Sequence, residues 1–346
     1  MATTSRYSKG YVTARWTGER RWLCLLALLI AALLPSCSRS DAKPTSDVAS
    51  PRVFRVVRSK QLTALAVIDK QRTLEAALAA LGVEVRWLEF AAGPQQLEAL
   101  NAGELDLALT AESPPAFAQA ADGPVVYLAH RAPSGKAVSC LVAPGSGIEK
   151  VADLKGKRVT FQKASVGHYL LTKALAREGL SLNDVQPVYL PPPDAQAAFS
   201  ERKVDAWLIW EPFATRGIKS GIAKALFDGE GLRDSGDFYT TNRKFYDHGQ
   251  EILKVFFSEL RKAEAWSEAH PREMAELLSS DLMIDVPTLL EMHQKYTFGV
   301  FPITPEIITK QQAVADLYYS LHFLPKKVDV KPGFLSTAEY AALLPP

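Results

Sequence analysis

Short apolar runs alternate with segments of helical period over the first half of the chain. The apolar runs lie at 53–57, 83–90, 105–110, 125–130, 137–143 and 158–162. Between them, 73–82, 94–103 and 114–121 carry apolar residues at helical spacing, and Gly82 and Gly103 stand where helices commonly end. This alternation predicts α/β layers with a largely parallel sheet.

A second block of the same kind follows. It predicts helices at 167–178 and 194–201 and strands at 187–190, 204–210 and 223–228. Beyond Tyr246 the apolar patterns are helical in period, and no further strand is predicted. A chain that builds one α/β unit, then another, and returns as helices predicts two domains joined by two crossings. The candidate crossings are 130–136 and 236–244.

The composition is that of a folded globular protein. Of the 346 residues, 47% are hydrophobic and 23% are charged, which excludes a disordered tail, a disulfide knot and a polytopic membrane protein. The first 37 residues hold five of the 40 basic residues and one of the 38 acidic residues, so the body carries 35 basic and 37 acidic residues. That body lacks the basic excess of a nucleic-acid-binding protein. Its length of roughly 300 residues favours two domains.

The beginning of the chain predicts an export signal. A basic pair precedes the twelve apolar residues from Leu23 to Leu34, a run too short to span a bilayer comfortably. The sequence Leu-Pro-Ser-Cys that ends at Cys37 resembles the bacterial lipobox. It predicts a signal peptide over 1–36 and lipidation of Cys37 as the first mature residue. Ordinary secretion without a lipid is the alternative.

The polar stretch 37–51 is expected to be a flexible tether, so that the fold begins near Arg52. Of the three cysteines only Cys140 then remains in the body. Its apolar neighbours predict a buried strand residue rather than a nucleophile.

Three predicted strand ends lead into turns that begin a helix. The turns are 90–95, with Gly93 followed by Pro94, then 110–115 and 162–168. In open α/β sheets the ligand crevice lies beyond the carboxyl ends of the strands. A helix amino end exposes unpaired N–H groups and a partial positive charge. Together these features predict a cleft that binds a small anion.

Four segments carry a resemblance to a known family. They are EFAAGPQQLEALNAGELDLALTAESPPAFAQAA, VADLKGKRVTFQKASVGHYLL, PPPDAQAAFSERKVDAWLIWEPF and QQAVADLYYSLHFLPKKVDV. In this order they are similar to the periplasmic aliphatic-sulfonate-binding proteins of ABC importers. The similarity covers about 52–331 and implies the α/β fold of a type II periplasmic binding protein, in which two α/β domains joined by two crossover segments hold a ligand in the cleft between them. Domain 1 would comprise 52–132 and 241–346, and domain 2 would comprise 133–240.

The resemblance also implies which residues bind the ligand in the cleft. They are Lys60, Gln61, Gly93, Pro94, Gln95, Thr110, Ala111, Glu112, Ser113, Gln162, Ser165, Val166, Gly167, His168, Asp194, Trp210 and Glu211. The chain departs from the family in two places. The loop 164–167 lacks two hydroxyl side chains, and 58–61 is more basic than the family's glycine-containing segment. Both departures lie where they would alter ligand preference.

Several of these residues admit two interpretations. Glu112 and Glu211 either cap a helix or pair with a basic neighbour, or they contact the cationic end of a zwitterionic ligand. Trp210 either lines the cleft against an apolar tail or belongs to the core, whereas Trp207, on the opposite face of the strand, is expected in the core. His168 is expected at a helix start near the anion rather than as a metal ligand or a catalytic base.

The function that follows from the resemblance is that of a solute-binding receptor without catalytic activity, cofactor or metal. It would deliver an aliphatic sulfonate to an inner-membrane ABC permease and its ATPase, as a monomer in the periplasm that a lipid at Cys37 could anchor. The alternatives are the same fold tuned to taurine, nitrate or a thiamine precursor, and an enzyme that uses His168 and Glu211 as acid and base.

Overall fold

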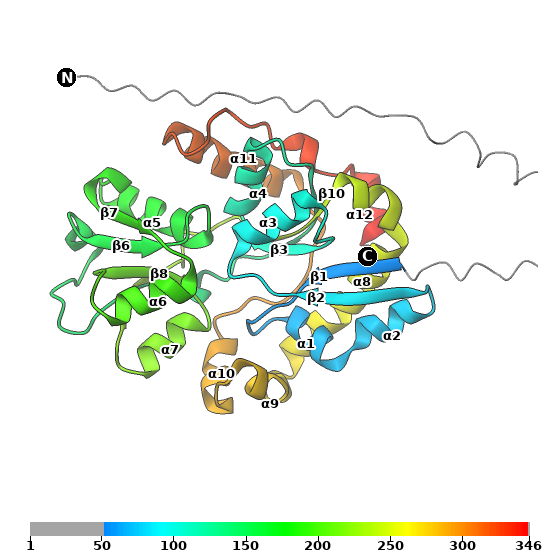
Figure 1. The fold of residues 1–346 in the computed structure, drawn as a ribbon, viewed down its shortest axis with the longest axis horizontal. Helices are drawn as coiled ribbons and strands as arrows, with labels where there is room; N and C mark the ends of the chain where they lie inside the picture. The colour runs from blue at the N-terminus through cyan, green and yellow to red at the C-terminus, as the bar shows by residue number, and fades with distance from the viewer. Residues whose placement is uncertain (1–51, 345–346) are drawn as a thin grey trace, which may run out of the picture. The chain divides into compact units, whose positions relative to one another are not determined.

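The computed structural model describes residues 52–344, and Figure 1 shows the arrangement of their helices and strands. The predicted signal peptide over 1–36, the predicted tether over 37–51 and the lipidation predicted at Cys37 lie outside the described residues. Within the described range, ten strands form three sheets with the orders β1-β2, β3-β10-β4 and β7-β6-β8-β5-β9.

The strands are short, as their apolar runs predict. Their bounds are β1 Arg52–Val57, β2 Val83–Leu88, β3 Ala108–Ala111, β4 Val125–Arg131, β5 Val138–Val142, β6 Arg158–Phe161, β7 Gln186–Tyr189, β8 Ala206–Trp210, β9 Lys224–Asp228 and β10 Asp237–Asn242.

Twelve α-helices within the described range surround these sheets. Their bounds are α1 Ala64–Gln71, α2 Thr73–Ala79, α3 Gly93–Ala102, α4 Ser113–Ala120, α5 Val166–Arg177, α6 Pro192–Ser200, α7 Phe213–Lys219, α8 Arg243–Ala269, α9 Pro271–Leu282, α10 Val286–His293, α11 Pro305–Ser320 and α12 Thr337–Leu343. We call β1–β4, β10, α1–α4 and α8–α12 lobe 1, and β5–β9 with α5–α7 lobe 2.

Parallel pairing is less extensive than the sequence predicts. The pairs β1-β2, β6-β7 and β6-β8 are parallel, but β5 and β10 each run antiparallel to both of their neighbours. The chain enters β5 and β10 from the other lobe, through the short connections 132–137 and 229–236. Both strands therefore begin after a change of sheet and not after the helical crossover that joins parallel neighbours within one sheet.

Four elements have no counterpart among the predicted ones: α1, α7, α12 and β10. Strand β10 occupies most of the candidate crossing 236–244. Five consecutive residues of this central strand, from Phe238 to Asn242, are buried, so both of its faces are covered. A strand covered on both faces shows no alternation of apolar and polar residues, so periodicity could not reveal it.

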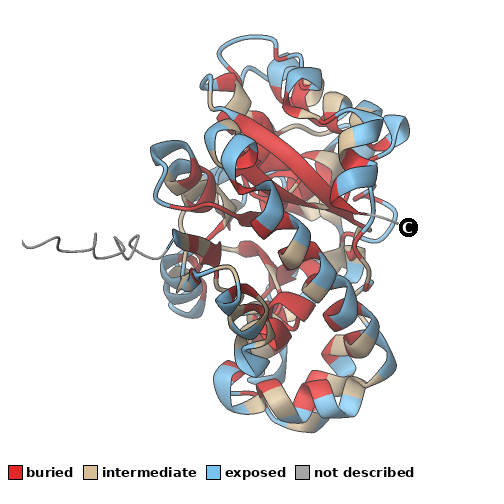
Figure 2. Cartoon of the chain, turned by 90° about the vertical axis from the view of Figure 1, so that its right-hand side faces the viewer, coloured by how far each residue is buried: buried red, intermediate tan, exposed pale blue. Residues whose placement is uncertain are grey.

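The core of lobe 1 packs against the long helix α8. The ring of Phe54 on β1 stacks on Phe245 at 5.4 Å and meets Phe256 edge-on at 6.0 Å. Figure 2 shows how burial follows the strands and the inward faces of the helices. In lobe 2, Trp207 is 1% exposed and Cys140 is a fully buried free thiol whose pKa is raised by burial, which confirms that both belong to the core.

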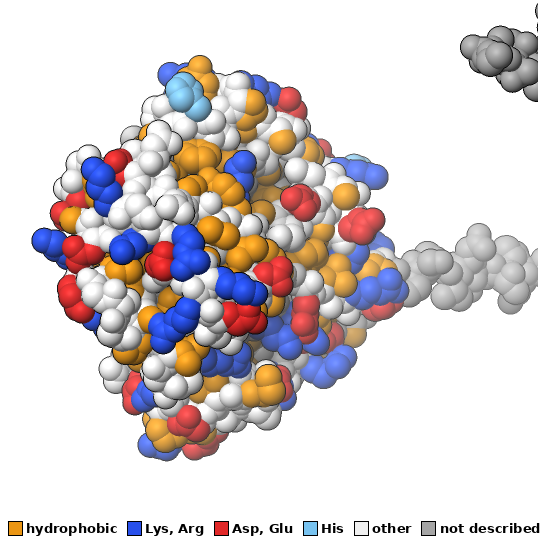
Figure 3. Space-filling view, turned by 60° about the vertical axis from the view of Figure 1, so that its left-hand side comes forward, with side chains coloured by type: hydrophobic (Ala, Val, Ile, Leu, Met, Phe, Trp, Pro, Cys, Tyr) orange, Lys and Arg blue, Asp and Glu red, His pale blue; other side chains and the backbone are white. Residues whose placement is uncertain are grey.

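The surface carries charges of both signs. Basic and acidic side chains are interspersed over the face shown in Figure 3, in keeping with a body of nearly balanced charge. Among the described helices, none combines the length and the hydropathy that crossing a membrane requires.

Candidate ligand-binding site

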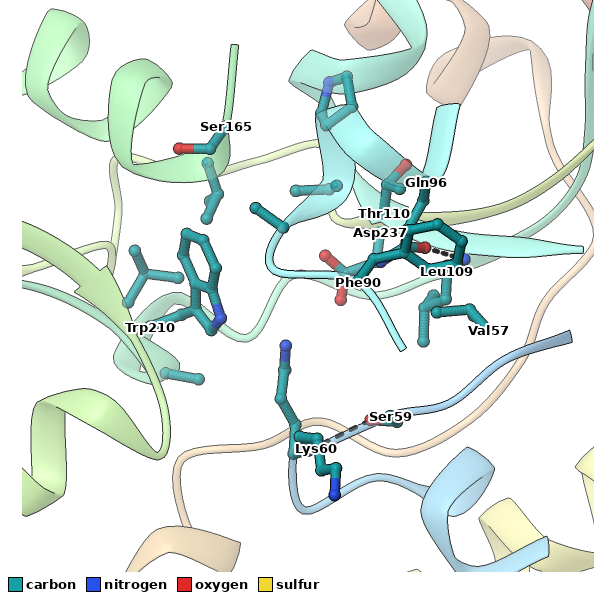
Figure 4. A pocket seen from close by; sticks show the side chains of 18 of the residues that line it. Val57, Ser59, Lys60, Phe90, Gln96, Leu109, Thr110, Ser165, Trp210 and Asp237 are labelled. Atoms are coloured by element: carbon teal, nitrogen blue, oxygen red, sulfur yellow. Dashed lines mark hydrogen bonds between the residues drawn. The ribbon is translucent and has the colours of Figure 1, made fainter. Parts of the chain in front are cut away.

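A cavity of about 250 Å³ lies where the two lobes meet (Figure 4). Lobe 1 lines it with the ends of β1 and β3 and the start of α3, and lobe 2 lines it with the end of β8 and the start of α5. Pockets for drug-sized ligands measure roughly 300–1,000 Å³. The cavity therefore suits a small solute.

The start of α3 borders the cavity and requires a glycine. A Cβ at Gly93 would lie 2.8 Å from Cγ of Pro114 and 3.3 Å from Cβ of Thr110. The preceding residue, Ala92, has no side chain that could cap the helix. The first N–H groups of α3 therefore lack a side-chain partner, which favours an anionic ligand at this end.

The start of α5 is held rigidly beside the cavity. The hydroxyl of Ser165 accepts a hydrogen bond from the N–H of Gly167 at 3.1 Å and donates one to the carbonyl of Gln162 at 2.7 Å. A Cβ at Gly167 would lie 3.1 Å from Leu208, so the helix approaches β8 closely. Ser165 and Val166 consequently face the cavity.

The third predicted helix start, that of α4, contributes little to the cavity lining. At the beginning of α4, the hydroxyls of Ser113 and Tyr318 are 3.0 Å apart and buried. Only Pro114 of this helix lines the cavity.

Five charged residues line the cavity. Four are basic, namely Arg58, Lys60, Arg131 and Arg233, and one, Asp237, is acidic. Each of the two at the end of β1 has an acidic neighbour: Nε of Arg58 lies 2.8 Å from Asp69, and Nζ of Lys60 lies 3.1 Å from Glu89. These two side chains are 40% and 58% exposed, so solvent weakens both pairs.

The other three charged residues belong to a buried network where the lobes join. Arg233 Nη2 lies 2.8 Å from Glu112 and 2.5 Å from Asp237, and Arg131 lies 3.6 Å from Asp237 and 3.4 Å from Glu264. Asp237 is 20% exposed, whereas each of the other four side chains is at most 3% exposed. Asp237 is therefore the member of the network that the cavity reaches best.

Burial and pairing act against each other within this network. Burial lowers the pKa of the Arg131 and Arg233 guanidiniums, but the carboxylates beside them outweigh burial and raise both values. Burial raises the pKa of the Glu112 carboxyl, although Arg233 opposes it. Both guanidiniums are charged, and each has its carboxylate partner in place.

The predicted ligand-binding residues divide into two groups. Those that line the cavity are Lys60, Gln61, Gly93, Thr110, Ala111, Ser165, Val166 and Trp210. Those that lie outside the lining are Pro94, Gln95, Glu112, Ser113, Gln162, Gly167, His168, Asp194 and Glu211. Among the second group, Asp194 is exposed near the start of α6, where Pro193 borders the cavity instead.

The two predicted glutamates are fully buried and paired with basic side chains. Glu112 accepts two hydrogen bonds from Arg233, at 2.9 and 2.8 Å. Glu211 accepts hydrogen bonds from the N–H and the hydroxyl of Thr215, at 3.0 and 2.9 Å, and from Lys295 of lobe 1, at 2.5 Å. Glu211 therefore joins the two lobes behind the cavity lining.

His168 lies in an aromatic cluster and not at the cavity surface. Its ring stacks on Phe161 at 5.1 Å and meets Phe323 edge-on at 4.6 Å. Burial, with a smaller effect of the nearby Lys163 charge, lowers the pKa of His168 to about 3, so the imidazole is neutral. Among the residues that the structure describes, no group of three His, Cys, Asp or Glu side chains is placed to hold a metal ion.

The sequence reasoning missed the charged residues at the joins between the lobes. Arg131 and Asp237 lie within the predicted crossings 130–136 and 236–244, and Arg233 lies just before the second. A charged residue inside a predicted crossing was the signal that could have identified Arg131 and Asp237.

Comparisons with known proteins agree with this geometry. The family model described as NMT1/THI5 like matches residues 78–274. The solved alkanesulfonate-binding protein from Xanthomonas axonopodis pv. citri, bound to MOPS, is 36% identical, with a TM-score of 0.79 over 83% of this chain and 99% of that chain. The periplasmic aliphatic sulphonate binding protein from Escherichia coli is 35% identical, with a TM-score of 0.74 over 83% of this chain and 93% of that chain. These structures confirm the predicted fold class.

Proposed function

Because this chain belongs to the NMT1/THI5-like family and, within it, to the family of the aliphatic-sulfonate-binding proteins, we propose that it captures an alkanesulfonate between its lobes and delivers it to an ABC permease. The observation that carries the proposal is the cavity lining, which brings four basic residues and one acidic residue to a space of about 250 Å³.

A sulfonate is ionised at physiological pH and offers only acceptor oxygens, so its site needs donors. The basic side chains and the uncapped start of α3 supply donors and positive potential. Trp210 and Val166 offer an apolar surface for an aliphatic tail on the lobe 2 side.

The two lobes correspond to the proposed domains, 52–132 with 241–346 and 133–240. The arrangement of the sheets supports this division, and β10 lies across the second boundary. We expect ligand exchange by opening of the lobes about the connections 132–137, which follows Arg131, and 229–236, which contains Arg233.

The cellular setting is also a proposal. A signal peptide over 1–36 would export the chain to the periplasm, and a lipid at Cys37 would hold it at the membrane as a monomer. The Escherichia coli relative is a periplasmic binding protein, which supports export of this chain. Mass spectrometry of the protein purified from membranes would show whether the amino-terminal cysteine carries a lipid.

Binding itself is tested by thermal shift and calorimetry with the purified chain from residue 38 onward. The ligands are a series of alkanesulfonates, taurine, nitrate, sulfate and a pyrimidine. We expect the alkanesulfonates to raise the melting temperature, because a ligand at 100 times its Kd stabilises the folded state by about 2.7 kcal/mol. Stabilisation by nitrate or the pyrimidine alone would contradict the proposal.

The placement of His168 and Glu211 supports binding without turnover. Both are buried outside the cavity lining, and Glu211 is occupied by Thr215 and Lys295. We therefore expect the ligand to be recovered chemically unchanged after prolonged incubation. Ligand conversion that His168→Ala abolishes would establish an enzyme instead.

A further inference from the structure

Asp237 is the only acidic residue of the described chain that lines the cavity. It begins β10, opposite Ala111 of β3 and Arg131 of β4, at the join between the lobes. Figure 4 shows its carboxylate directed into the cavity, on the side that faces Trp210. An acidic group in an anion-binding cavity calls for a physical explanation, since it repels the charge that the cavity otherwise attracts.

The carboxylate of Asp237 is only partly satisfied by protein groups. Its Oδ1 accepts a hydrogen bond from Arg233 at 2.5 Å. Its Oδ2 lies 3.6 Å from Nη1 of Arg131, which is longer than a hydrogen bond. One oxygen of this carboxylate can therefore still accept a hydrogen bond from a ligand.

Two neutral oxygens of the lining also lack partners. The hydroxyls of Tyr296 and Thr110 are buried and make no hydrogen bond within the protein. Thr110 is opposite Phe238 on β10, one position from Asp237. Burial, followed by the charges of Glu211 and of Asp237 among others, raises the pKa of the Tyr296 hydroxyl, so it is neutral. A buried polar atom without a partner destabilises the protein unless a ligand or water satisfies it.

The charges of the buried network around Asp237 favour a cation beside its carboxylate. The network holds three carboxylates, Glu112, Asp237 and Glu264, against two guanidiniums, Arg131 and Arg233. A protonated amine beside Asp237 would balance the excess negative charge. The remaining basic residues, Arg58 and Lys60, lie at the end of β1, and their acidic neighbours Asp69 and Glu89 stand outside the lining. That side of the cavity therefore presents basic groups, whereas the acidic group of the lining is Asp237.

We propose that the preferred ligands are aminoalkanesulfonates, zwitterions whose ammonium group binds Asp237 with the hydroxyls of Tyr296 and Thr110 while the sulfonate binds the basic side and the helix starts. The inference rests on the proposed function, because it assigns the second end of the same ligand. The proposal predicts that the protein distinguishes sulfonates of similar size and shape by the charge of their second end.

The test compares three sulfonates of equal length by calorimetry on the wild-type chain. Propanesulfonate ends in a methyl group, 2-hydroxyethanesulfonate in a hydroxyl and 2-aminoethanesulfonate in an ammonium group. We expect the ammonium ligand to bind at least about tenfold more tightly than either neutral one. Equal binding of all three would overturn the inference and leave the proposed function standing, whereas binding of none would overturn both.

Variants test whether Asp237 causes the preference for the ammonium ligand. Asp237→Asn keeps the shape of the side chain, and we expect it to remove the preference for the ammonium ligand while propanesulfonate still binds. Asp234→Asn is the matched control, because Asp234 is an acidic neighbour in the chain outside the lining, and it should retain the preference. An equal loss of affinity for both ligands in Asp237→Asn would contradict the inference.

A second variant covers the case in which Asp237→Asn fails to fold, since Asp237 also pairs with Arg233. Tyr296→Phe leaves the charge network intact and removes one acceptor beside the ammonium. We expect it to reduce the ratio of the two affinities by about threefold, with a circular-dichroism spectrum like that of the wild type. An unchanged ratio would exclude Tyr296 from the amine site.

Discussion

The two walls of the cavity differ in kind. All five charged lining residues come from lobe 1 or from the joins between the lobes, whereas lobe 2 contributes uncharged groups such as Ser165, Val166, Trp210 and Phe213. The part of this charged wall that lies at the joins, namely Arg131, Arg233 and Asp237, is held by a network of buried ion pairs, so it is set before any ligand arrives. The uncharged wall excludes water and offers apolar surface. Charge recognition and enclosure are thus divided between the lobes.

The largest expected effect is a loss of stability when the buried ion pairs of the charged wall are disrupted. Arg233→Met leaves the fully buried Glu112 without its basic partner and also removes a partner of Asp237, and removing one member of a buried ion pair costs about 3–5 kcal/mol. Urea unfolding of the ligand-free chain measures this loss. Arg86→Met, which breaks an exposed pair with Glu84 on β2, is the control and should leave the unfolding midpoint unchanged. A similar effect of both variants would contradict the special role of burial.

The next effect concerns acid stability. The folded state holds His168 neutral, with its pKa lowered from 6.5 to about 3, and the unfolded state takes up a proton near 6.5. The contribution of His168 is therefore fully present above pH 6.5 and is lost as the pH falls toward 3, by up to about 1.4 kcal/mol per pH unit. Urea unfolding between pH 7 and 4 measures the slope.

His168→Phe keeps an aromatic ring in the cluster and removes the titrating group. We expect a shallower dependence of the unfolding free energy on pH in this variant. A slope equal to that of the wild type would assign the acid sensitivity to other groups, such as the paired carboxylates of the charged wall.

A third prediction concerns Trp210 in the uncharged wall that lobe 2 contributes. Trp210→Ala removes apolar surface from the cavity and should weaken alkanesulfonate binding by about tenfold, or about 1.4 kcal/mol, with a smaller loss of ligand-free stability. Trp207→Ala is the matched control, because this fully buried tryptophan should cost about 3–5 kcal/mol of stability. Calorimetry and urea unfolding separate the two. Equal stability losses would make Trp210 a core residue.

The smallest effect tests a charge away from the cavity. Lys219 of α7 lies 2.7 Å from Glu291 of α10, and the two side chains are 49% and 60% exposed. Exposed pairs contribute little, so Lys219→Met should change the unfolding free energy by less than about 0.5 kcal/mol. A loss comparable with that of Arg233→Met would show that ion pairs between the lobes matter regardless of burial.

Prediction from the sequence succeeded where a local signal existed. Gly103 ends α3 with a left-handed backbone (φ 73°), and Gly93 followed by proline begins it at the cavity. It failed where burial on both faces removes periodicity, as in β10. It also failed for α1, whose first five residues are all buried.

The site was predicted in the same uneven way. The helix starts that line the cavity follow from turns that neighbouring residues encode, whereas Arg233 and Glu112 are 121 positions apart and meet only in the folded chain. No pattern along the chain indicates such a pair.

The sequence by itself determined the alternating elements, the apolar core and the helix starts, because each depends on residues close together in the chain. Only the tertiary structure decided which charges meet at the joins, that Glu112 and Glu211 are occupied by basic partners, and that Asp237 is the acid exposed to the cavity. Burial and pairing depend on what surrounds a residue in space, and those surroundings come from distant parts of the chain.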